Sequence, residues 1–249
     1  MKTIMITGCS SGFGLETARH FLNEGWRVVA TMRKPDATLL PASEHLRILP
    51  LDVTDHASIA EAVAAAGPVD VLVNNAGVGW LSPFEATSED VVRRIFDTNT
   101  FGTFEMIRAV LPQMREKGEG VIVNVSSSVT LKSLPLLPVY TASKAAVNAY
   151  TDCLALELAP LGIRVQLVLP GRAPSTSFGT NARALMADAM EAPAAYKPFV
   201  DEVMGAFMAD ADKEPTRSED VVKAIWRAVT DPSCPAHLPA GSDAEALAA

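Results

Sequence analysis

Short apolar runs rich in β-branched residues alternate with longer segments of helical periodicity along most of the chain. The runs are nearly continuous in their apolarity, which is typical of strands buried on both faces of a sheet. Strand–helix alternation of this kind predicts right-handed crossovers and a doubly wound parallel sheet in a three-layer α/β fold. The predicted strands are Thr3–Thr7, Arg27–Thr31, Arg47–Leu51, Val69–Asn74, Val121–Val125 and Arg164–Leu169. The predicted helices between them are Leu15–Glu24, Ile59–Ala66, Ser88–Lys117 and Val139–Leu161.

The region from Pro170 to Pro215 interrupts this alternation, because it holds several prolines and a Met- and Ala-rich stretch. We interpret residues 172–215 as a helical flap over the substrate site, inserted after the sixth strand. A helix over Ser218–Thr230 and a last strand near Ala236–Pro239 then resume the pattern. The whole chain, residues 1–249, is therefore predicted to form a single domain.

Composition and charge narrow the function classes. The formal net charge of −8 and the absence of basic runs give no support to binding of nucleic acid or an anionic membrane. The cysteines, Cys9, Cys153 and Cys234, are scattered, and neither they nor the four histidines suggest a disulfide framework or a metal site. The first apolar stretch is too short for a signal sequence or a membrane span. We therefore expect a cytoplasmic protein that holds no metal.

A cluster of glycines follows the first predicted strand, where the chain reads Thr7-Gly8-Cys9-Ser10-Ser11-Gly12-Phe13-Gly14. Glycine permits a sharp turn and close approach of the backbone, and the N–H groups of the following helix can bind an anion. A pyrophosphate at the carboxyl end of the sheet is the natural ligand. A tight strand–helix turn without a ligand would explain the cluster alone about as well.

The segment Thr7–Gly14 resembles the T-G-x-x-x-G-x-G element of the short-chain dehydrogenase/reductase family. Further elements follow in the family's order: Asn74-Asn75-Ala76-Gly77, Asn99, Ser127, Tyr140-Thr141-Ala142-Ser143-Lys144 and Pro170-Gly171. The resemblance implies a Rossmann-type fold and hydride transfer between a nicotinamide cofactor and a carbonyl or alcohol carbon. It also implies that the cofactor is bound by Gly8, Ser10, Ser11, Gly12, Phe13, Gly14, Asn75, Ala76, Gly77, Tyr140, Lys144, Pro170 and Gly171.

The residues after the second predicted strand indicate which nicotinamide cofactor is used. NAD-specific sites usually place an acid there to bind the ribose 2′-hydroxyl, but this chain has Met32 followed by Arg33 and Lys34. Because a guanidinium suits a 2′-phosphate, we predict NADP(H), with Arg33 as the main contact and Lys34 as a weaker one. The alternative is that both cations are solvated loop residues. After the third strand, the resemblance gives Asp52, with Val53, a contact to adenine, although a turn-forming aspartate is an equal alternative.

Tyr140 and Lys144 stand four positions apart in a helical segment and therefore share one helix face. A nearby ammonium group lowers the pKa of a phenol, which makes the tyrosine a usable acid or base. The family spacing selects Ser127 as the residue that holds the substrate oxygen, and leaves Ser126 and Ser128 with structural roles. The resemblance assigns Asn99 to a water-mediated proton relay toward Lys144. An amide that only packs or caps the helix is the alternative reading of Asn99.

The loop after Pro170-Gly171 departs from the family pattern, because Pro174 and three hydroxyl residues shift the register. Ser175 and Thr176 are both candidates for the contact with the cofactor carboxamide. A hydrophobic ketone, aldehyde or alcohol is the expected substrate. An equal alternative is that many of the apolar residues of the predicted pocket belong to an ordinary helix core or to a subunit contact. The predicted pocket residues are Trp80, Leu81, Leu134, Leu136, Leu137, Val139, Phe178, Leu185, Met186, Met190, Tyr196, Phe199, Val203 and Met204.

The sequence thus predicts an NADP(H)-dependent alcohol dehydrogenase or carbonyl reductase. Two alternatives stay open: a cofactor-binding regulator without chemistry, and an isomerase or dehydratase that does not consume the cofactor. The long helices Ser88–Lys117 and Val139–Leu161 carry more small and apolar residues than one sheet face needs. We therefore expect a homodimer or homotetramer.

Overall fold

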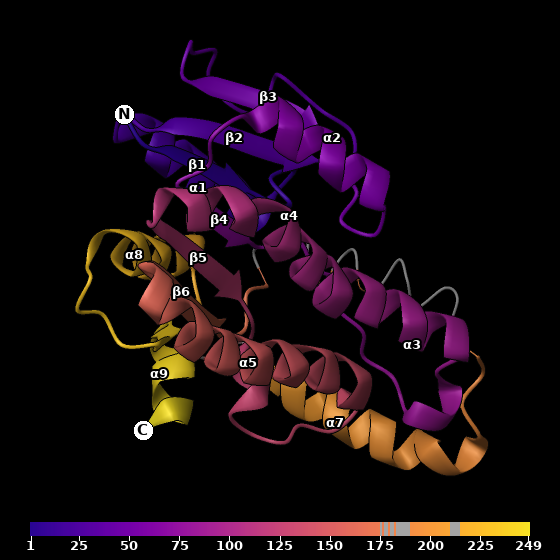
Figure 1. Cartoon of the computed structure of the whole chain (residues 1–249). Coiled ribbons are helices and arrows are strands. Elements are labelled where there is room, and N and C mark those ends of the chain that lie inside the picture. The colour runs from indigo at the N-terminus through magenta and orange to yellow at the C-terminus, as the bar shows by residue number, and fades with distance from the viewer. Residues whose placement is uncertain (175, 177–178, 180–181, 183–189, 210–214) are drawn as a thin grey trace.

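Seven parallel strands form one sheet in the order β3-β2-β1-β4-β5-β6-β7 (Figure 1). The structure is a computed structural model that describes residues 1–174, 176, 179, 182, 190–209 and 215–249. The chain runs outward from β1 to β3 and then, from β4, in the opposite direction, so the strand order reverses between β1 and β4. In sheets of this kind the ligand crevice lies at that reversal, outside the carboxyl ends of the strands.

The predicted fold class is confirmed. Both ends of each predicted strand lie within two residues of the ends of the observed strand. Hydrophobicity predicted these positions well because most of the strands, β1, β2, β4, β5 and β6, are buried almost throughout. The strands are β1 (Thr3–Ile6), β2 (Arg27–Met32), β3 (Leu46–Pro50), β4 (Val71–Asn74), β5 (Gly120–Val125), β6 (Ile163–Pro170) and β7 (His237–Ala240).

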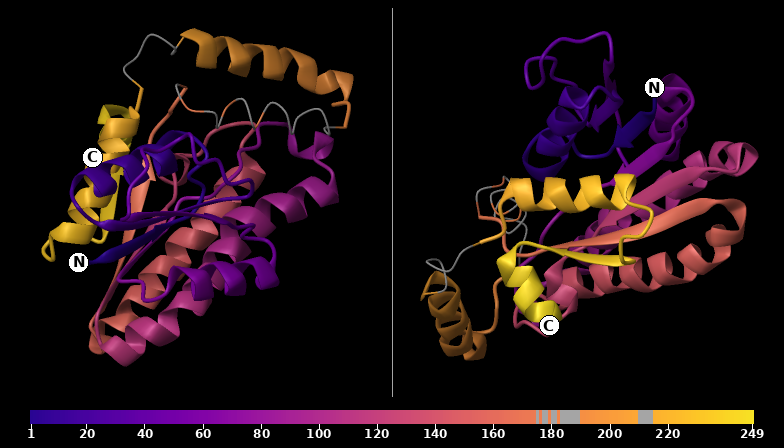
Figure 2. Two further views of the ribbon diagram at one scale, coloured as in Figure 1. Left: turned by 90° about the horizontal axis from the view of Figure 1, so that it is seen from above. Right: turned by 90° about the vertical axis from the view of Figure 1, so that its left-hand side faces the viewer.

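Helices cover both faces of the sheet (Figure 2). Side chains alternate along each strand, so Ile4 and Ile6 of β1 pack in one core while Met5 packs in the other. The first core lies under α1 (Gly12–Asn23) and α8 (Ser218–Thr230). The second lies under α2 (His56–Ala66), α4 (Gly102–Lys117) and α5 (Pro138–Leu158).

The prediction of one continuous α-helix over Ser88–Lys117 is wrong, because the segment consists of two α-helices joined by a π-helical segment. α3 (Glu89–Phe96) passes into a π-helical segment, Asp97–Phe101, before α4 begins. A π turn holds one residue more than an α turn, so it changes the direction in which the following side chains point. The predicted helix Val139–Leu161 likewise ends at Leu158 and continues as a 3-10 turn that contains Pro160.

The segment predicted as a flap is described in part. A 3-10 turn over Ala194–Tyr196 leads into α7 (Lys197–Ala209), which stands clear of the sheet (Figure 2). After α8 and β7, the chain ends with α9 (Ser242–Ala248). No helix among the described residues is both long and apolar enough to span a membrane. The predicted site or pocket residues Ser175, Phe178, Leu185 and Met186 lie outside the described residues.

Candidate active site

The glycine-rich turn between β1 and α1 packs directly against the loop that follows β4. Gly8 has a φ of +75°, and a Cβ there would lie 2.9 Å from the Cα of Ala76. A Cβ on Gly14 would lie 2.4 Å from the carbonyl oxygen of Gly8. Real Cβ atoms do not approach other heavy atoms so closely, so both positions require glycine.

The N-terminus of α1 is open to an anion. α1 begins at Gly12, and Ser11 stands at its N-cap with extended backbone and no capping hydrogen bond from its side chain. The first N–H groups of a helix have no partner within the helix and carry a partial positive charge. With Ser10 exposed beside them, these groups suit the oxygens of a pyrophosphate, so the residues present are compatible with a dinucleotide. Phe13 packs toward the first core.

The loop Asn75-Ala76-Gly77 braces the glycine turn. The Asn75 amide donates to the carbonyl oxygens of Thr7, at 2.9 Å, and Gly8, at 3.2 Å. The Thr7 hydroxyl accepts the backbone N–H groups of Asn75 and Ala76. Gly77 lies close to the centre of the site, since a Cβ there would be 3.3 Å from Asn99 Oδ1 and 3.5 Å from Lys144 Nζ.

Ser127, Tyr140 and Lys144 meet at the carboxyl end of β5. Their residues are 8%, 6% and 5% exposed, so all three are shielded from bulk water. Ser127 is the second residue after β5 and forms a side-chain hydrogen bond with Tyr140. Lys144, one helical turn beyond Tyr140 on α5, donates from Nζ to the carbonyl oxygen of Val125 at 2.9 Å. The three side chains that the sequence assigned to chemistry therefore form one cluster.

Burial dominates the protonation of this cluster. It raises the pKa of the Tyr140 phenol to about 12, and the hydrogen bond with Ser127 opposes that rise. Burial also lowers the pKa of the Lys144 ammonium to about 8. For the protein groups alone, the predicted lowering of the tyrosine pKa is therefore wrong, because desolvation of the phenolate dominates. The Tyr140 phenol is therefore protonated at neutral pH.

The serines beside Ser127 make structural contacts. Ser126 Oγ donates to Asn148 Oδ1 at 2.5 Å, and Asn148 Nδ2 donates to the Thr130 hydroxyl. Thr130, at a position where the family often has glycine, donates its hydroxyl proton to the carbonyl oxygen of Ser127 at 2.8 Å. Ser128 lies in the 3-10 turn that follows. These bonds hold the peptide that carries Ser127.

Asn99 sits in the π-helical segment, completely buried. Its amide is bonded on both sides, since Oδ1 accepts from Val78 N at 2.8 Å and Nδ2 donates to Val78 O at 2.9 Å. A further bond runs from Nδ2 to Ser143 Oγ on α5. Asn99 thereby fixes the loop after β4 against α5, beside Gly77 and Lys144. The water relay stays a prediction.

Arg33 and Lys34 are exposed directly after β2, and Met32 is the last residue of that strand. A backbone hydrogen bond from Thr54 holds the pKa of Asp52 below its ordinary value, and the charge of Arg33 acts in the same direction. Arg33 and Asp52, which follow β2 and β3, are therefore near enough for their charges to interact. Asp52 forms the turn that was its alternative reading, while Val53 is buried under Gly102 of α4.

The loop that follows β6 reaches back to the glycine turn. Pro170 ends β6, and Gly171 begins the loop. Thr176 lies over Gly12, since a Cβ on that glycine would be 3.2 Å from the Thr176 Cβ. Of the two residues predicted to meet the carboxamide, Thr176 is thus placed at the cofactor crevice, and Ser175 is outside the described residues.

The predicted pocket residues divide into core and rim. Trp80 and Val139 are buried in a small core with Val91 and Ile95 of α3, and so they do not line an open pocket. Leu136 holds a φ of +63°, which costs a residue other than glycine roughly 1–2 kcal/mol. Its carbonyl oxygen accepts a hydrogen bond from Ser82 N, which joins two loops near the site.

Apolar side chains of the flap differ in their exposure. Met190 and Phe199 are 56% and 47% exposed, whereas Val203 of α7 is buried. The backbone of Met190 donates to Ala86 O, which ties the flap to the loop before α3. The exposed pair is compatible with a rim that contacts an apolar ligand.

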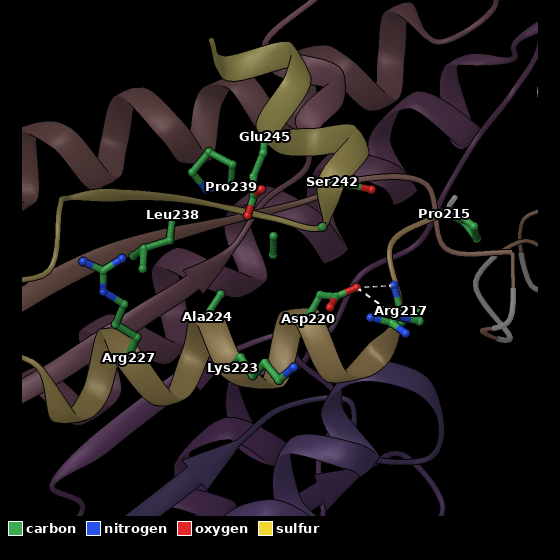
Figure 3. A pocket seen from close by; sticks show the side chains of 12 residues that line it. Pro215, Arg217, Asp220, Lys223, Ala224, Arg227, Leu238, Pro239, Ser242 and Glu245 are labelled. Carbon is green, nitrogen blue, oxygen red and sulfur yellow. Dashed lines mark hydrogen bonds and ion pairs between the residues drawn. The ribbon is translucent and has the colours of Figure 1, made fainter. Parts of the chain in front are cut away.

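Some residues at or near the site were missed. Thr7 was read only as part of the glycine motif, and Ser143 only as part of the Tyr140–Lys144 motif. Thr216 and Asp243, which bind the loop after β6, had no recognisable signal, because nothing in the sequence pairs them with Gly171. A groove between α8, β7 and α9 contains none of the predicted site residues (Figure 3). No group of three or more acidic, His or Cys side chains suitable for a metal occurs in the described part of the chain.

Comparison with known proteins agrees with this geometry. The family model of the short chain dehydrogenases matches residues 2–185, and the chain belongs to that family. A solved short-chain dehydrogenase from Streptomyces avermitilis is 34% identical, with a TM-score of 0.84 over 99% of this chain and 90% of that chain.

Two curated relatives are similar over about two thirds of the chain. The 3-ketodihydrosphingosine reductase of Bacteroides thetaiotaomicron is 42% identical over 174 residues, which are 68% of this chain and 63% of that protein. Retinol dehydrogenase 8 of Bos taurus is 41% identical over 182 residues, 68% of this chain and 58% of the relative. The chain therefore spans less than two thirds of the length of these relatives.

Proposed function

We propose that this protein is an NADP(H)-dependent oxidoreductase that transfers a hydride between nicotinamide and a carbonyl or secondary alcohol of a hydrophobic small molecule. The observation that carries the proposal is the buried cluster of Ser127, Tyr140 and Lys144 beside a glycine turn that suits a pyrophosphate. A regulator without chemistry has no need to bury a lysine, because burying a charge is costly.

The side chains have separate roles in the proposed reaction. A bound nicotinamide cofactor would supply or accept the hydride. The hydroxyl groups of Ser127 and Tyr140 hold the substrate oxygen, and Tyr140 donates its proton to that oxygen during reduction. Because burial holds the Tyr140 pKa near 12, the donor is protonated at neutral pH, which favours carbonyl reduction under those conditions. Lys144, one helical turn from Tyr140 on α5, would stabilise negative charge that develops on the phenol.

NADP(H) is proposed because the end of β2 offers a guanidinium and no acid. Arg33 is exposed and free to turn toward a 2′-phosphate, and Met32 replaces the acid that would bind a 2′-hydroxyl. Solved neighbours of the family include complexes with NADP+ and with NADH, so the family alone does not decide the cofactor. The proposal of NADP(H) therefore rests on Met32 and Arg33 at the end of β2.

A hydrophobic substrate is proposed from the rim and from the relatives. The exposed apolar side chains Met190 and Phe199 belong to the flap, and Leu136 belongs to the loop before α5. The two curated relatives are named as a 3-ketodihydrosphingosine reductase and a retinol dehydrogenase, and a ketone with a long alkyl chain and an alcohol with a long polyene chain are the compounds in those names. We propose a ketone or secondary alcohol with an extended apolar body.

The experiment follows the absorbance of NADPH and NADH with a panel of apolar ketones, and of NADP+ and NAD+ with the corresponding alcohols. NADPH consumption with at least one ketone is expected, with kcat/KM at least about tenfold higher than with NADH. Arg33→Met should lower kcat/KM for NADPH by roughly tenfold or more and leave NADH unchanged, since a charge-assisted bond is lost. Lys34→Met is the matched control, with a smaller loss. A panel without turnover contradicts the proposal.

We also propose a cytoplasmic homo-oligomer built on the outer faces of α4 and α5. Phe101, beside α4, is 53% exposed, and Phe104 of α4 stacks on Tyr150 of α5 with ring centroids 3.9 Å apart. An apolar aromatic surface of this kind suits a twofold interface. Light scattering after size exclusion should give twice or four times the mass of 26.4 kDa.

A further inference from the structure

Two side chains that are distant in sequence meet beyond the carboxyl ends of β6 and β7. Thr216, which precedes α8, is completely buried. Its Oγ1 lies 2.6 Å from Asp243 Oδ1, in the first turn of α9, and 2.9 Å from the carbonyl oxygen of Ala240. The carboxylate is the nearer and more strongly accepting of the two, so we assign the hydroxyl proton to Asp243. A hydroxyl–carboxylate bond of this length is charge-assisted and stronger than a neutral one. Figure 3 shows the residues on either side of this pair, with Pro215 and Arg217 flanking Thr216 and Ser242 at the start of α9.

The pair holds the backbone on both sides of the flap. On the outgoing side, Gly171 N donates to Thr216 Oγ1 at 3.0 Å, and Arg172 N donates to Asp243 Oδ2 at 2.7 Å. On the returning side, Thr216 N donates to Arg172 O at 2.9 Å. The segment from 172 to 215 therefore leaves and re-enters the fold at one point, and Thr216 and Asp243 form that point.

Two glycines make room for this arrangement. A Cβ on Gly171 would lie 2.1 Å from Asp243 Oδ1, and a Cβ on Gly241 would lie 2.2 Å from Thr216 Oγ1. Gly241 also has a φ of +100°, which side-chain-bearing residues rarely adopt. The carboxylate thus sits directly against the Gly171 backbone, which has no space to shift toward α9.

The same loop ends at the cofactor crevice. Gly171 and Arg172 open the loop that places Thr176 over Gly12, at the N-terminus of α1. A shift of Gly171 would change the position of Thr176 over the glycine turn. We propose that Thr216 and Asp243 are positioning residues, which fix the backbone of Gly171 and Arg172 and thereby hold Thr176 over the glycine turn, where a cofactor would bind. The inference rests on the proposed function, because it assumes that a nicotinamide nucleotide occupies the crevice.

Each substitution at Thr216 or Asp243 removes particular hydrogen bonds to the loop after β6. Without the Thr216 hydroxyl, Gly171 N retains only the longer bond to Ala240 O, at 3.2 Å, and Asp243 Oδ1 loses its strongest donor. Without the Asp243 carboxylate, Arg172 N loses its acceptor. An unpaired backbone N–H at a partly buried position is costly, so the loop should move to find water.

The test compares Thr216→Val, which keeps the shape and removes the hydroxyl, with Thr216→Ser, which keeps the hydroxyl. Arg164→Met serves as the control for general destabilisation, because Arg164 donates to the Ala228 and Val229 carbonyls at the end of α8 and touches neither Thr216 nor Asp243. For each variant, amide hydrogen exchange at Gly171 and Arg172, the Kd of NADPH by fluorescence, and kcat and KM at saturating ketone are measured. Asp243→Asn provides a second variant if Thr216→Val does not fold.

We expect faster exchange at Gly171 and Arg172 in Thr216→Val, and an NADPH Kd raised about tenfold, which corresponds to one lost hydrogen bond. The kcat at saturating NADPH should stay within about twofold, because Tyr140 and Ser127 are untouched. Thr216→Ser should restore the wild-type Kd. Arg164→Met should lower Tm without raising the Kd.

Three results separate the possibilities. An unchanged NADPH Kd in Thr216→Val, with a wild-type chain that binds NADPH, overturns the positioning role alone. An equal rise in Kd in Arg164→Met also overturns it, because the effect then follows global stability. A wild-type chain that binds no nicotinamide nucleotide overturns the proposed function and this role together, whereas the exchange rates at Gly171 and Arg172 still report the anchor itself.

Discussion

The carboxyl edge of the sheet and the flap differ in how their side chains are held. At the edge, Tyr140, Lys144 and Asn99 are buried and fixed by hydrogen bonds from neighbouring elements. In the flap, Met190 and Phe199 are exposed, and backbone bonds near the two flap ends tie the segment to the rest of the chain. A rigid edge suits proton transfer, which requires fixed geometry, whereas an exposed rim can vary with the substrate at little cost to the core.

The largest effect should come from the edge. Tyr140→Phe removes the proton donor and should lower kcat by roughly 10²–10⁴-fold, with the NADPH Kd changed by no more than about threefold. Tyr150→Phe, which removes a hydroxyl from the outer side of the same helix, is the matched control and should retain full turnover. Turnover near wild type in Tyr140→Phe would remove this tyrosine from the chemistry.

Substitution of one glycine in each region, Gly14 at the sheet edge and Gly205 in the flap, compares the two regions directly. A Cβ at Gly14 would meet Gly8 O at 2.4 Å and Asn75 Nδ2 at 2.5 Å, so Gly14→Ala should deform the turn. We expect the NADPH Kd to rise by at least about tenfold, or roughly 1.4 kcal/mol. Gly205→Ala in α7 meets no atom within 4 Å and should leave the Kd unchanged while stabilising the helix by about 0.5–1 kcal/mol. Titration calorimetry and urea unfolding measure both, and equal Kd values for the two variants would contradict the comparison.

The buried Lys144 should give the edge a pH-dependent stability that the flap lacks. Its pKa is lowered from 10.5 to about 8 by burial, so between these values the unfolded chain binds more protons than the folded one. The free energy of unfolding of the wild type, relative to Lys144→Met, should therefore rise as pH increases from 7 to 10. The rise should be on the order of 1–3 kcal/mol.

Urea unfolding at several pH values measures this difference. Tyr140, whose raised pKa of about 12 affects stability only above pH 10, is present in both proteins and cancels. Lys223→Met, at an exposed position on α8, is the control and should run parallel to the wild type. Parallel curves for wild type and Lys144→Met would show that the ammonium is hydrated in the folded protein.

The smallest effect should come from the flap. Phe199→Ser removes a side chain that is half exposed, so the free energy of unfolding should change by less than about 0.5 kcal/mol. The KM for an extended apolar ketone should rise about three- to tenfold, with little change for a short ketone. Leu156→Ser, 80% exposed on α5, is the control and should leave both KM values unchanged. Equal KM values for the long ketone in wild type and Phe199→Ser would show that the substrate does not contact this part of the flap.

Local patterns in the sequence determined the sheet and most of the candidate site. Alternation of strands and helices fixed the fold, and strand ends were placed within two residues, because buried strands need continuous apolar runs. Ser127, Tyr140 and Lys144 were selected by family spacing, and the structure brings them together. The segment from Ser88 to Lys117 was predicted as one α-helix, because the spacing of apolar residues does not reveal the extra residue of a π turn.

Tertiary structure alone decided three other features. The direction of the Tyr140 pKa shift depends on how many atoms surround the phenol, which no spacing rule gives. The burial of Trp80 in the core with α3, rather than in a pocket, depends on where α3 packs. The bonds of Thr216 and Asp243 to Gly171 and Arg172 join segments that only the folded sheet brings to one place. Sequence encodes short-range periodicity directly, whereas such long-range contacts exist only after the chain has folded.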